Sequence, residues 1–260
     1  MRKFVHPTAI VNKGAKLGTG VQVGPFCVIG GDVSIDSDTR LHGHVTIDGH
    51  TKIGSACEIF PYTSIGLPPQ DVRYKGEDTL LVIGDRNIIR EYVSIHRASS
   101  SGDAVTRVGN DNFIMAYCHI AHNCTLGNGI IMANAATLAG HSSIQDQAVI
   151  GGIVAVHQFT RIGAYAIVGG FSGVAQDVPP YMMASGARAK LYGPNLVGLK
   201  RAGFSHQKIA LIKKAYKIIS KSKLSLKEAL KETQTQIHDS PEVDALVEFI
   251  SAKSPRGVLR

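Results

Sequence analysis

IMAYCH-IAHNCT-LGNGII-MANAAT-LAGHSS-IQDQAV-IGGIVA-VHQ, residues 114–158, repeats with a period of six. An aliphatic residue opens every hexad, and most residues four positions further on are small or β-branched. One large aliphatic and one small residue per six is typical of hexapeptide β-helices, in which each hexad forms one short wall. Three walls make a triangular coil of about 18 residues, so this stretch predicts a stack of such coils.

The same pattern runs from Val5 to Val174 and is interrupted twice. Apart from Met132, every hexad opens with Ile, Leu or Val. The interruptions are residues 66–82 and residues 96–107. Long loops inside a strict repeat are more often functional than decorative, so we expect both to serve a binding or catalytic site.

Helical spacing replaces the hexads near residue 180. Ser205 can cap a first helix, Ser225 opens a capping box, and Ser240 precedes a first-turn proline. The sequence therefore predicts two domains, a β-helix over 1–180 and an α-helical domain over 181–260.

Composition favours an ordinary globular protein. The 260 residues are 44% apolar and 18% charged, and no apolar run approaches the roughly 20 residues that cross a bilayer. The first residues lack the apolar core of a signal peptide. We expect no transmembrane segment and a cytoplasmic location.

The net charge of +8 is unevenly distributed. Residues 1–179 carry 13 Lys and Arg against 14 Asp and Glu, whereas residues 180–260 carry 15 against 6. A basic region attracts nucleic acid, an anionic membrane or an acidic protein, and the alternative is a solvated lysine-rich helix face.

The four cysteines fall at the small position of their hexads. They are Cys27, Cys57, Cys118 and Cys124, and none forms a zinc-type CxxC pair with another. We expect buried packing residues rather than nucleophiles.

Histidines mark the candidate chemistry. His122, Gly140 and Gln158 are spaced by 18, which places them in one column on successive coils, and His141 lies in the next column. Neighbouring coils lie about 4.8 Å apart. A histidine can take a proton from a hydroxyl, and a glycine N–H can stabilise an oxyanion. This combination indicates acyl transfer to an alcohol or amine.

Two other functions fit parts of the pattern. Three histidines and a water can bind catalytic zinc, as in a gamma-type carbonic anhydrase. That reading leaves both loops and the basic tail unexplained, and it lacks partners for the ligand histidines. A non-catalytic scaffold leaves the histidine column without a purpose.

Five motifs together resemble the UDP-N-acetylglucosamine O-acyltransferases over the whole chain. They are HIAHNC (119–124), LAGH (138–141), AVHQF (155–159), GVAQDVPPY (173–181) and GLKR (198–201). The resemblance implies an all-β left-handed parallel β-helix with a C-terminal helical domain, and a homotrimer with active sites between subunits. It implies transfer of an (R)-3-hydroxyacyl group from acyl carrier protein to the sugar 3-OH, in the first step of lipid A biosynthesis.

The resemblance also assigns roles to residues. His122 matches the general base and Gly140 the oxyanion donor. The substrate-binding set comprises Gln70, Asp71, Arg73, His96, His119, His141, His157, Gln158, Asn195 and Arg201, of which the last two match nucleotide contacts. Gly170 matches the position that gauges acyl length. The acidic carrier gives the basic tail a protein partner rather than nucleic acid. No metal or cofactor is implied, because phosphopantetheine arrives with the donor.

Four positions depart from the pattern of some members. Asn123 occupies a position where some members have aspartate, so an amide without a charge orients the base. Arg73 occupies a position where some members have lysine. Val197 replaces an acid near the nucleotide base, and Phe171 can shorten the acyl pocket. The sequence does not fix the acyl length, and it leaves open a 3-amino analogue of the sugar as acceptor.

Overall fold

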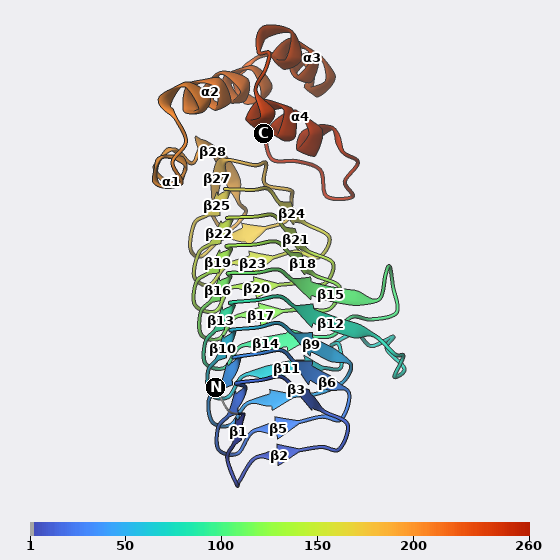
Figure 1. The fold of residues 1–260 in the computed structure, drawn as a ribbon. Helices are drawn as coiled ribbons and strands as arrows, with labels where there is room; N and C mark the ends of the chain where they lie inside the picture. Colours follow the sequence, from blue (N-terminus) through green and yellow to red (C-terminus); the bar gives the residue numbers. More distant parts are fainter. Residues whose placement is uncertain (1–2) are drawn as a thin grey trace.

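The chain folds into a tall three-sided prism with helices stacked at one end (Figure 1). The computed structural model describes residues 3–260. In this part of the chain, three sheets of 11, 9 and 8 strands form the walls, here called sheets A, B and C. Within residues 3–260 every strand pair is parallel except the last one in sheet A, so the predicted parallel β-helix is confirmed.

The strands are short and recur once per coil. Sheet A contains β1 (Phe4–Val5), β4 (Gln22–Val23), β7 (Arg40–Leu41), β10 (Glu58–Ile59), β13 (Ile88–Ile89), β16 (Phe113–Ile114), β19 (Ile131–Met132), β22 (Val149–Ile150), β25 (Ile167–Val168), β27 (Met182–Ser185) and β28 (Lys190–Pro194). Sheet B contains β2 (Ile10–Val11), β5 (Val28–Ile29), β8 (Thr46–Ile47), β11 (Ser64–Leu67), β14 (Ser94–His96), β17 (His119–Ile120), β20 (Thr137–Leu138), β23 (Ala155–Val156) and β26 (Gly173–Val174). Sheet C contains β3 (Lys16–Leu17), β6 (Val33–Ile35), β9 (Thr51–Ile53), β12 (Leu80–Ile83), β15 (Val105–Val108), β18 (Thr125–Leu126), β21 (Ser143–Ile144) and β24 (Arg161–Ile162).

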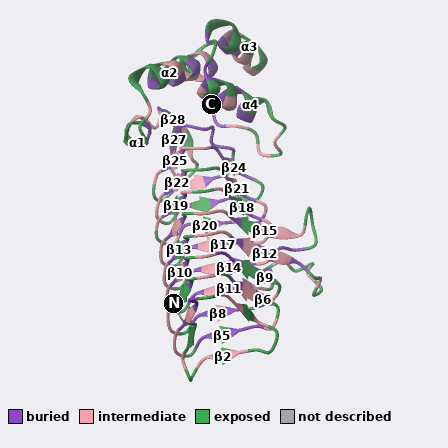
Figure 2. Cartoon of the chain, in the orientation of Figure 1, coloured by how far each residue is buried: buried purple, intermediate pink, exposed green. Residues whose placement is uncertain are grey.

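From Val23 onward the openings of the hexads form the core of the prism. Ile114 pairs with Met132, 18 residues on, and both side chains are fully buried. Figure 2 shows buried residues on coil after coil. All four cysteines are buried free thiols in this core, as predicted, and burial raises their pKa values, to about 12 for Cys124. β-Branched side chains suit such a pleated wall.

The corners of the prism use left-handed backbone. At most corners the residue three positions after a hexad opening has a positive φ, for example 59° at Asn123, 60° at His141 and 64° at Phe159. Non-glycine residues rarely adopt this conformation. Hydrogen bonds between coils hold it: His141 N–H donates to His122 O at 3.0 Å, and Phe159 N–H to Gly140 O at 3.1 Å. The corners therefore stack in fixed columns.

Both loops leave the same corner. The first joins β11 to β12 and the second joins β14 to β15, so each connects sheet B to sheet C. The register continues on the far side: Ser64 pairs with Ser94, and Ser94 with His119. We call this edge of the prism the B–C corner.

The helical domain begins later than the predicted boundary. β27 extends sheet A beyond residue 180 and β28 pairs with it antiparallel, before α1 (Leu196–Arg201). The predicted caps at Ser205, Ser225 and Ser240 are present. They open α2 (His206–Lys221), α3 (Leu226–Gln236) and α4 (Pro241–Ser251). No helix between residues 3 and 260 has the length and apolar character needed to span a membrane.

Candidate active site

The predicted base lies at the B–C corner with its proton position fixed. His122 Nδ1 lies 2.8 Å from Asn123 Oδ1. The amide orientation is fixed because Asn123 Nδ2 donates to Ser101 O at 2.8 Å and to Ser99 O at 3.3 Å. A carbonyl oxygen can only accept, so His122 Nδ1 carries the hydrogen and Nε2 keeps a lone pair. His122 can therefore accept a proton through Nε2.

Gly140 lies directly beside the base, one coil on. A Cβ built on Gly140 would lie 2.6 Å from His122 Cε1 and 2.8 Å from Nε2. Real Cβ atoms do not approach other atoms so closely, so glycine is what allows the imidazole to lie there. Within residues 3–260, the Gly140 N–H forms no hydrogen bond. The predicted oxyanion donor is thus next to the base.

His141 is held by two neighbours on the same corner. Its ring stacks on Phe159, with centroids 4.6 Å apart, and its Nε2 lies 3.1 Å from Ser101 Oγ. The ring is edge-on to His122 at 5.4 Å. Burial, followed by the charge of His122, lowers the pKa of His141. A neutral ring can position a substrate by hydrogen bonding.

Two more histidines line the adjoining wall. The His96 and His119 rings meet edge-to-face at 5.0 Å, and His119 Nδ1 bonds Ser94 Oγ at 2.7 Å. Burial lowers the pKa of His119 and lowers that of His96 to about 4. His96 Nδ1 is buried and has no partner within residues 3–260. Such an unsatisfied buried polar atom is rare in folded proteins, because leaving it unpaired is costly.

The first loop adds a carboxylate near the base. Arg73 holds Asp71 through two side-chain bonds of 3.1 and 2.9 Å, and these bonds lower the Asp71 pKa to about 2. The positive charge of protonated His122 also lowers the Asp71 pKa. Gln70, next in the chain, is exposed. Asp71 is therefore ionised at neutral pH and accepts hydrogen bonds.

The remaining predicted residues are divided between this corner and other parts of the chain. His157 and Gln158 join β23 to β24 and are exposed at the B–C corner, one coil beyond Gly140, and Arg256 Nε donates to Gln158 O at 2.7 Å. Gly170 belongs to the corner between sheets A and B, not to the B–C corner. Asn195 caps α1 and donates to Tyr165 O at 3.0 Å, and Arg201 ends that helix. In Figure 1, α1 and the two loops lie on opposite sides of the prism.

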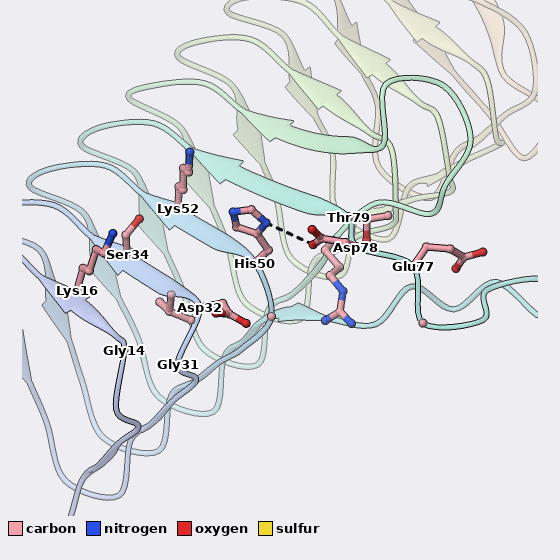
Figure 3. A pocket seen from close by; sticks show the side chains of 14 residues that line it. Gly14, Lys16, Gly31, Asp32, Ser34, His50, Lys52, Glu77, Asp78 and Thr79 are labelled. Carbon is pink, nitrogen blue, oxygen red and sulfur yellow. Dashed lines mark hydrogen bonds and ion pairs between the residues drawn. The ribbon is translucent and has the colours of Figure 1, made fainter.

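The cavity of largest volume described here does not coincide with this site. A cavity of about 610 Å³ lies on the N-terminal side of the first loop, among Lys16, Lys52 and His50 (Figure 3). His50 bonds Asp78 there at 3.4 Å. None of the predicted site residues lines this cavity.

The histidines do not converge on a common point. Among the residues that the structure describes, no three His, Cys, Asp or Glu side chains form a metal-binding group. His122 Nδ1 and His141 Nε2 each bond a side chain of this chain instead.

Ser99 and Ser101 are site residues that motif reasoning missed. Ser99 is 4% exposed, and both its N–H and its hydroxyl bond Asn123 Oδ1 at 3.0 Å. The only sequence signal was a serine-rich interruption of the repeat, which predicts a loop but not its contacts.

Comparison with known proteins agrees with this geometry. Residues 14–49 and 106–140 match the family described as bacterial transferase hexapeptide (six repeats). Residues 177–259 match that described as UDP N-acetylglucosamine O-acyltransferase, domain 2. Hexad coils with a histidine and an unpaired glycine N–H on one corner thus define a hexapeptide-repeat transferase.

Full-length relatives narrow the class. An acyl-(acyl-carrier-protein)–UDP-N-acetylglucosamine O-acyltransferase of Thermodesulfovibrio yellowstonii is 58% identical, over 98% of this chain and 99% of its own. One of Janthinobacterium sp. is 50% identical over 99% of each. The structure of LpxA from Acinetobacter baumannii has a TM-score of 0.96 at 41% identity, covering 98% of this chain and 99% of that one. The chain belongs to the acyl-(acyl-carrier-protein)–UDP-N-acetylglucosamine O-acyltransferase family.

Proposed function

We propose that this acyltransferase moves an (R)-3-hydroxyacyl group from acyl carrier protein to the 3-hydroxyl of UDP-N-acetylglucosamine, the first step of lipid A biosynthesis. One observation carries the proposal. His122 Nε2, which has a free lone pair, lies next to the Gly140 N–H, which forms no hydrogen bond within residues 3–260. Relatives at 58% and 50% identity bear the name of this enzyme.

The reaction follows from the positions of these groups. His122 Nε2 takes the proton of the sugar hydroxyl as its oxygen attacks the thioester carbonyl. The carbonyl oxygen becomes an anion and accepts a hydrogen bond from Gly140 N–H. Collapse of this intermediate expels the phosphopantetheine sulfur, which receives the proton from imidazolium. The ester and the free thiol leave, and His122 returns to its starting state without metal or resident cofactor.

The surrounding polar residues position the acceptor. Asp71, held by Arg73, and His141 lie near the base, and buried His96 leaves its Nδ1 without a hydrogen-bond partner among residues 3–260. We assign Gln70, His119, His157 and Gln158 to the same sugar nucleotide, and Asn195 and Arg201 to its nucleotide end. The Asn195 Oδ1 caps α1 and its Nδ2 donates to Tyr165 O, so the second lone pair of Oδ1 and the second hydrogen of Nδ2 are what it offers a ligand.

We infer a homotrimer whose sites lie between subunits. The corner between sheets A and B carries an exposed apolar column of Phe26, Tyr62, Tyr92, Tyr117, Ile153 and Phe171. A contiguous exposed apolar surface marks an interaction site. Gly170, the residue assigned to acyl length, lies on this corner, so a second copy can bring it to the histidines of the first. Cytoplasmic location stays a prediction from the sequence.

A turnover assay tests the proposal directly. The purified protein is given UDP-N-acetylglucosamine and 3-hydroxyacyl carrier proteins of graded length, and the product mass is measured. We expect a product heavier by one hydroxyacyl group, with one preferred length. Product only with the 3-amino sugar analogue would move the proposal to amide formation, and no product with either sugar would contradict it.

Charge reversal on α2 tests the carrier-binding surface. Lys213 and Lys217 are exposed one turn apart. Glutamate at both is expected to raise KM for the acidic carrier about tenfold at low salt, because like charges oppose docking. The effect shrinks as salt screens the charges. KM for the sugar nucleotide should stay within about twofold, and Lys13→Glu on the first coil serves as the control. Equal effects on both substrates would contradict carrier docking here.

A further inference from the structure

We propose that the second loop acts as a proton-ordering clamp: Ser99 and Ser101 fix the hydrogens of His122 and His141 through Asn123, and this loop requires an amide at position 123. The inference concerns the same site and rests on the proposed function. Ser99, Ser101 and Asn123 are positioning residues in it, because they act through the histidines.

A continuous chain of hydrogen bonds joins the two histidines. It runs from His141 Nε2 to Ser101 Oγ at 3.1 Å and from Ser101 Oγ to Ser99 Oγ at 3.0 Å. It continues from Ser99 Oγ to Asn123 Oδ1 at 3.0 Å and ends at His122 Nδ1, at 2.8 Å from that oxygen. The second loop therefore contacts the base and its neighbour at once.

Each contact in the chain has one possible direction. Asn123 Oδ1 only accepts, so both His122 Nδ1–H and the Ser99 hydroxyl donate to it. The single Ser99 hydrogen is then used, so Ser101 donates to Ser99. The Ser101 hydrogen is used in turn, so His141 Nε2–H donates to Ser101. Only this order gives every contact one hydrogen. It leaves a lone pair on His122 Nε2 and another on His141 Nδ1.

The loop also explains why an amide stands beside the base. Asn123 Nδ2 faces two backbone carbonyls, Ser101 O at 2.8 Å and Ser99 O at 3.3 Å. A carboxylate cannot donate, so its oxygen there would face Ser101 O without a hydrogen between them. Asn123 is therefore the residue that fits this loop, rather than a weakened aspartate.

Asn123→Asp separates these two explanations. A clamp that needs an amide predicts a loss of kcat by about tenfold to 100-fold, because the loop is released and His122 is misplaced. The new charge also favours imidazolium, so the acidic limb of kcat/KM moves to higher pH by about one unit. Other groups facing His122 are Asp71 and Arg73 of the first loop, His96 and His119 of sheet B, and His141; all are unchanged. Activity equal to or above that of the original protein would overturn the proposal.

Ser101→Ala tests the chain itself. We expect the ring nitrogens of His141, followed by ¹⁵N NMR of histidine-labelled protein, to change from a single tautomer to a mixture. The turnover should fall by about tenfold. Ser100→Ala is the matched control, because this neighbouring hydroxyl bonds Glu77 Oε1 at 3.4 Å and not the chain. An unchanged His141 tautomer in Ser101→Ala would contradict the clamp.

The two readouts separate this inference from the proposed function. The tautomers are measured without substrate, so an ordered His141 that loses its order in Ser101→Ala supports the clamp even if the original protein turns over neither sugar. Turnover by the original protein with tautomers that ignore both serines would keep the function and reject the clamp.

Discussion

His122→Ala is expected to lower kcat/KM by about three orders of magnitude, because general acid–base catalysis contributes about 10²- to 10⁴-fold. The oxyanion donor at Gly140 and the binding residues remain, so a residual rate persists. KM for both substrates should change little, since Nε2 acts on the hydroxyl only as its proton leaves. Steady-state kinetics with both substrates varied measures this split.

Two control variants test whether the loss of turnover comes from removing the His122 imidazole itself. His6→Ala removes an exposed histidine on the first coil, whose ring bonds Thr8 at 2.9 Å, and should leave turnover intact. His122→Gln keeps a polar side chain and should be as inactive as alanine. Melting curves should overlap with that of the original protein to within a few degrees. Turnover of His122→Ala above about a tenth of the original would reject His122 as the base.

Gly140→Ala should cost about 100-fold in kcat without unfolding the coil. The added methyl would lie 2.6 Å from His122 Cε1, so the imidazole must swing away from the reacting hydroxyl. Misplacement of a catalytic group by about 1 Å can cost 10²-fold. The backbone N–H remains, so the loss would come from the displaced base.

A double-mutant cycle identifies this cause. The nearest atoms to the added methyl all belong to the His122 ring. Gly140→Ala should therefore have little further effect in a His122→Ala background, and the two losses should not add. Additive losses would instead locate the damage at the backbone donor. Stability measured by denaturant should follow the same pattern, with the clash removed in the double variant.

The sequence predicts the prism well because one period governs it. Each opening such as Ile114 or Met132 contacts only the coils next to it, so a local pattern is enough to fix the wall, the column and the burial of the cysteines. The sequence did not predict β27 and β28, because they follow Pro180 without a hexad pattern. β27 pairs with β25, and β28 pairs with β27.

The site was predictable only where it follows the columns. Spacing by 18 placed Gly140 beside His122, and the structure has them in contact. The bonds of Ser99 and Ser101 depend on the path of a loop that no repeat dictates. Gly170 follows Gly140 by 30 residues, which is not a multiple of 18, so the spacing alone already assigns these two glycines to different corners, as the structure does. Asn195 looks like a ligand contact in sequence, yet half of its amide is used as a helix cap.

The fixed register across both loops has a further consequence. Ser64 pairs with Ser94 on the next coil, and Ser94 pairs with His119 on the coil after it, although the loops add different lengths of chain between them. Distances along the prism axis therefore come in whole steps of about 4.8 Å, since a coil is either inserted or not. Either loop can therefore change in length without shifting the register of the coils, as long as the second loop keeps its contacts with Asn123 and His141. Under the proposed function, the length of the acyl pocket assigned to Gly170 can change by whole coils, and finer changes within one coil come only from single side chains.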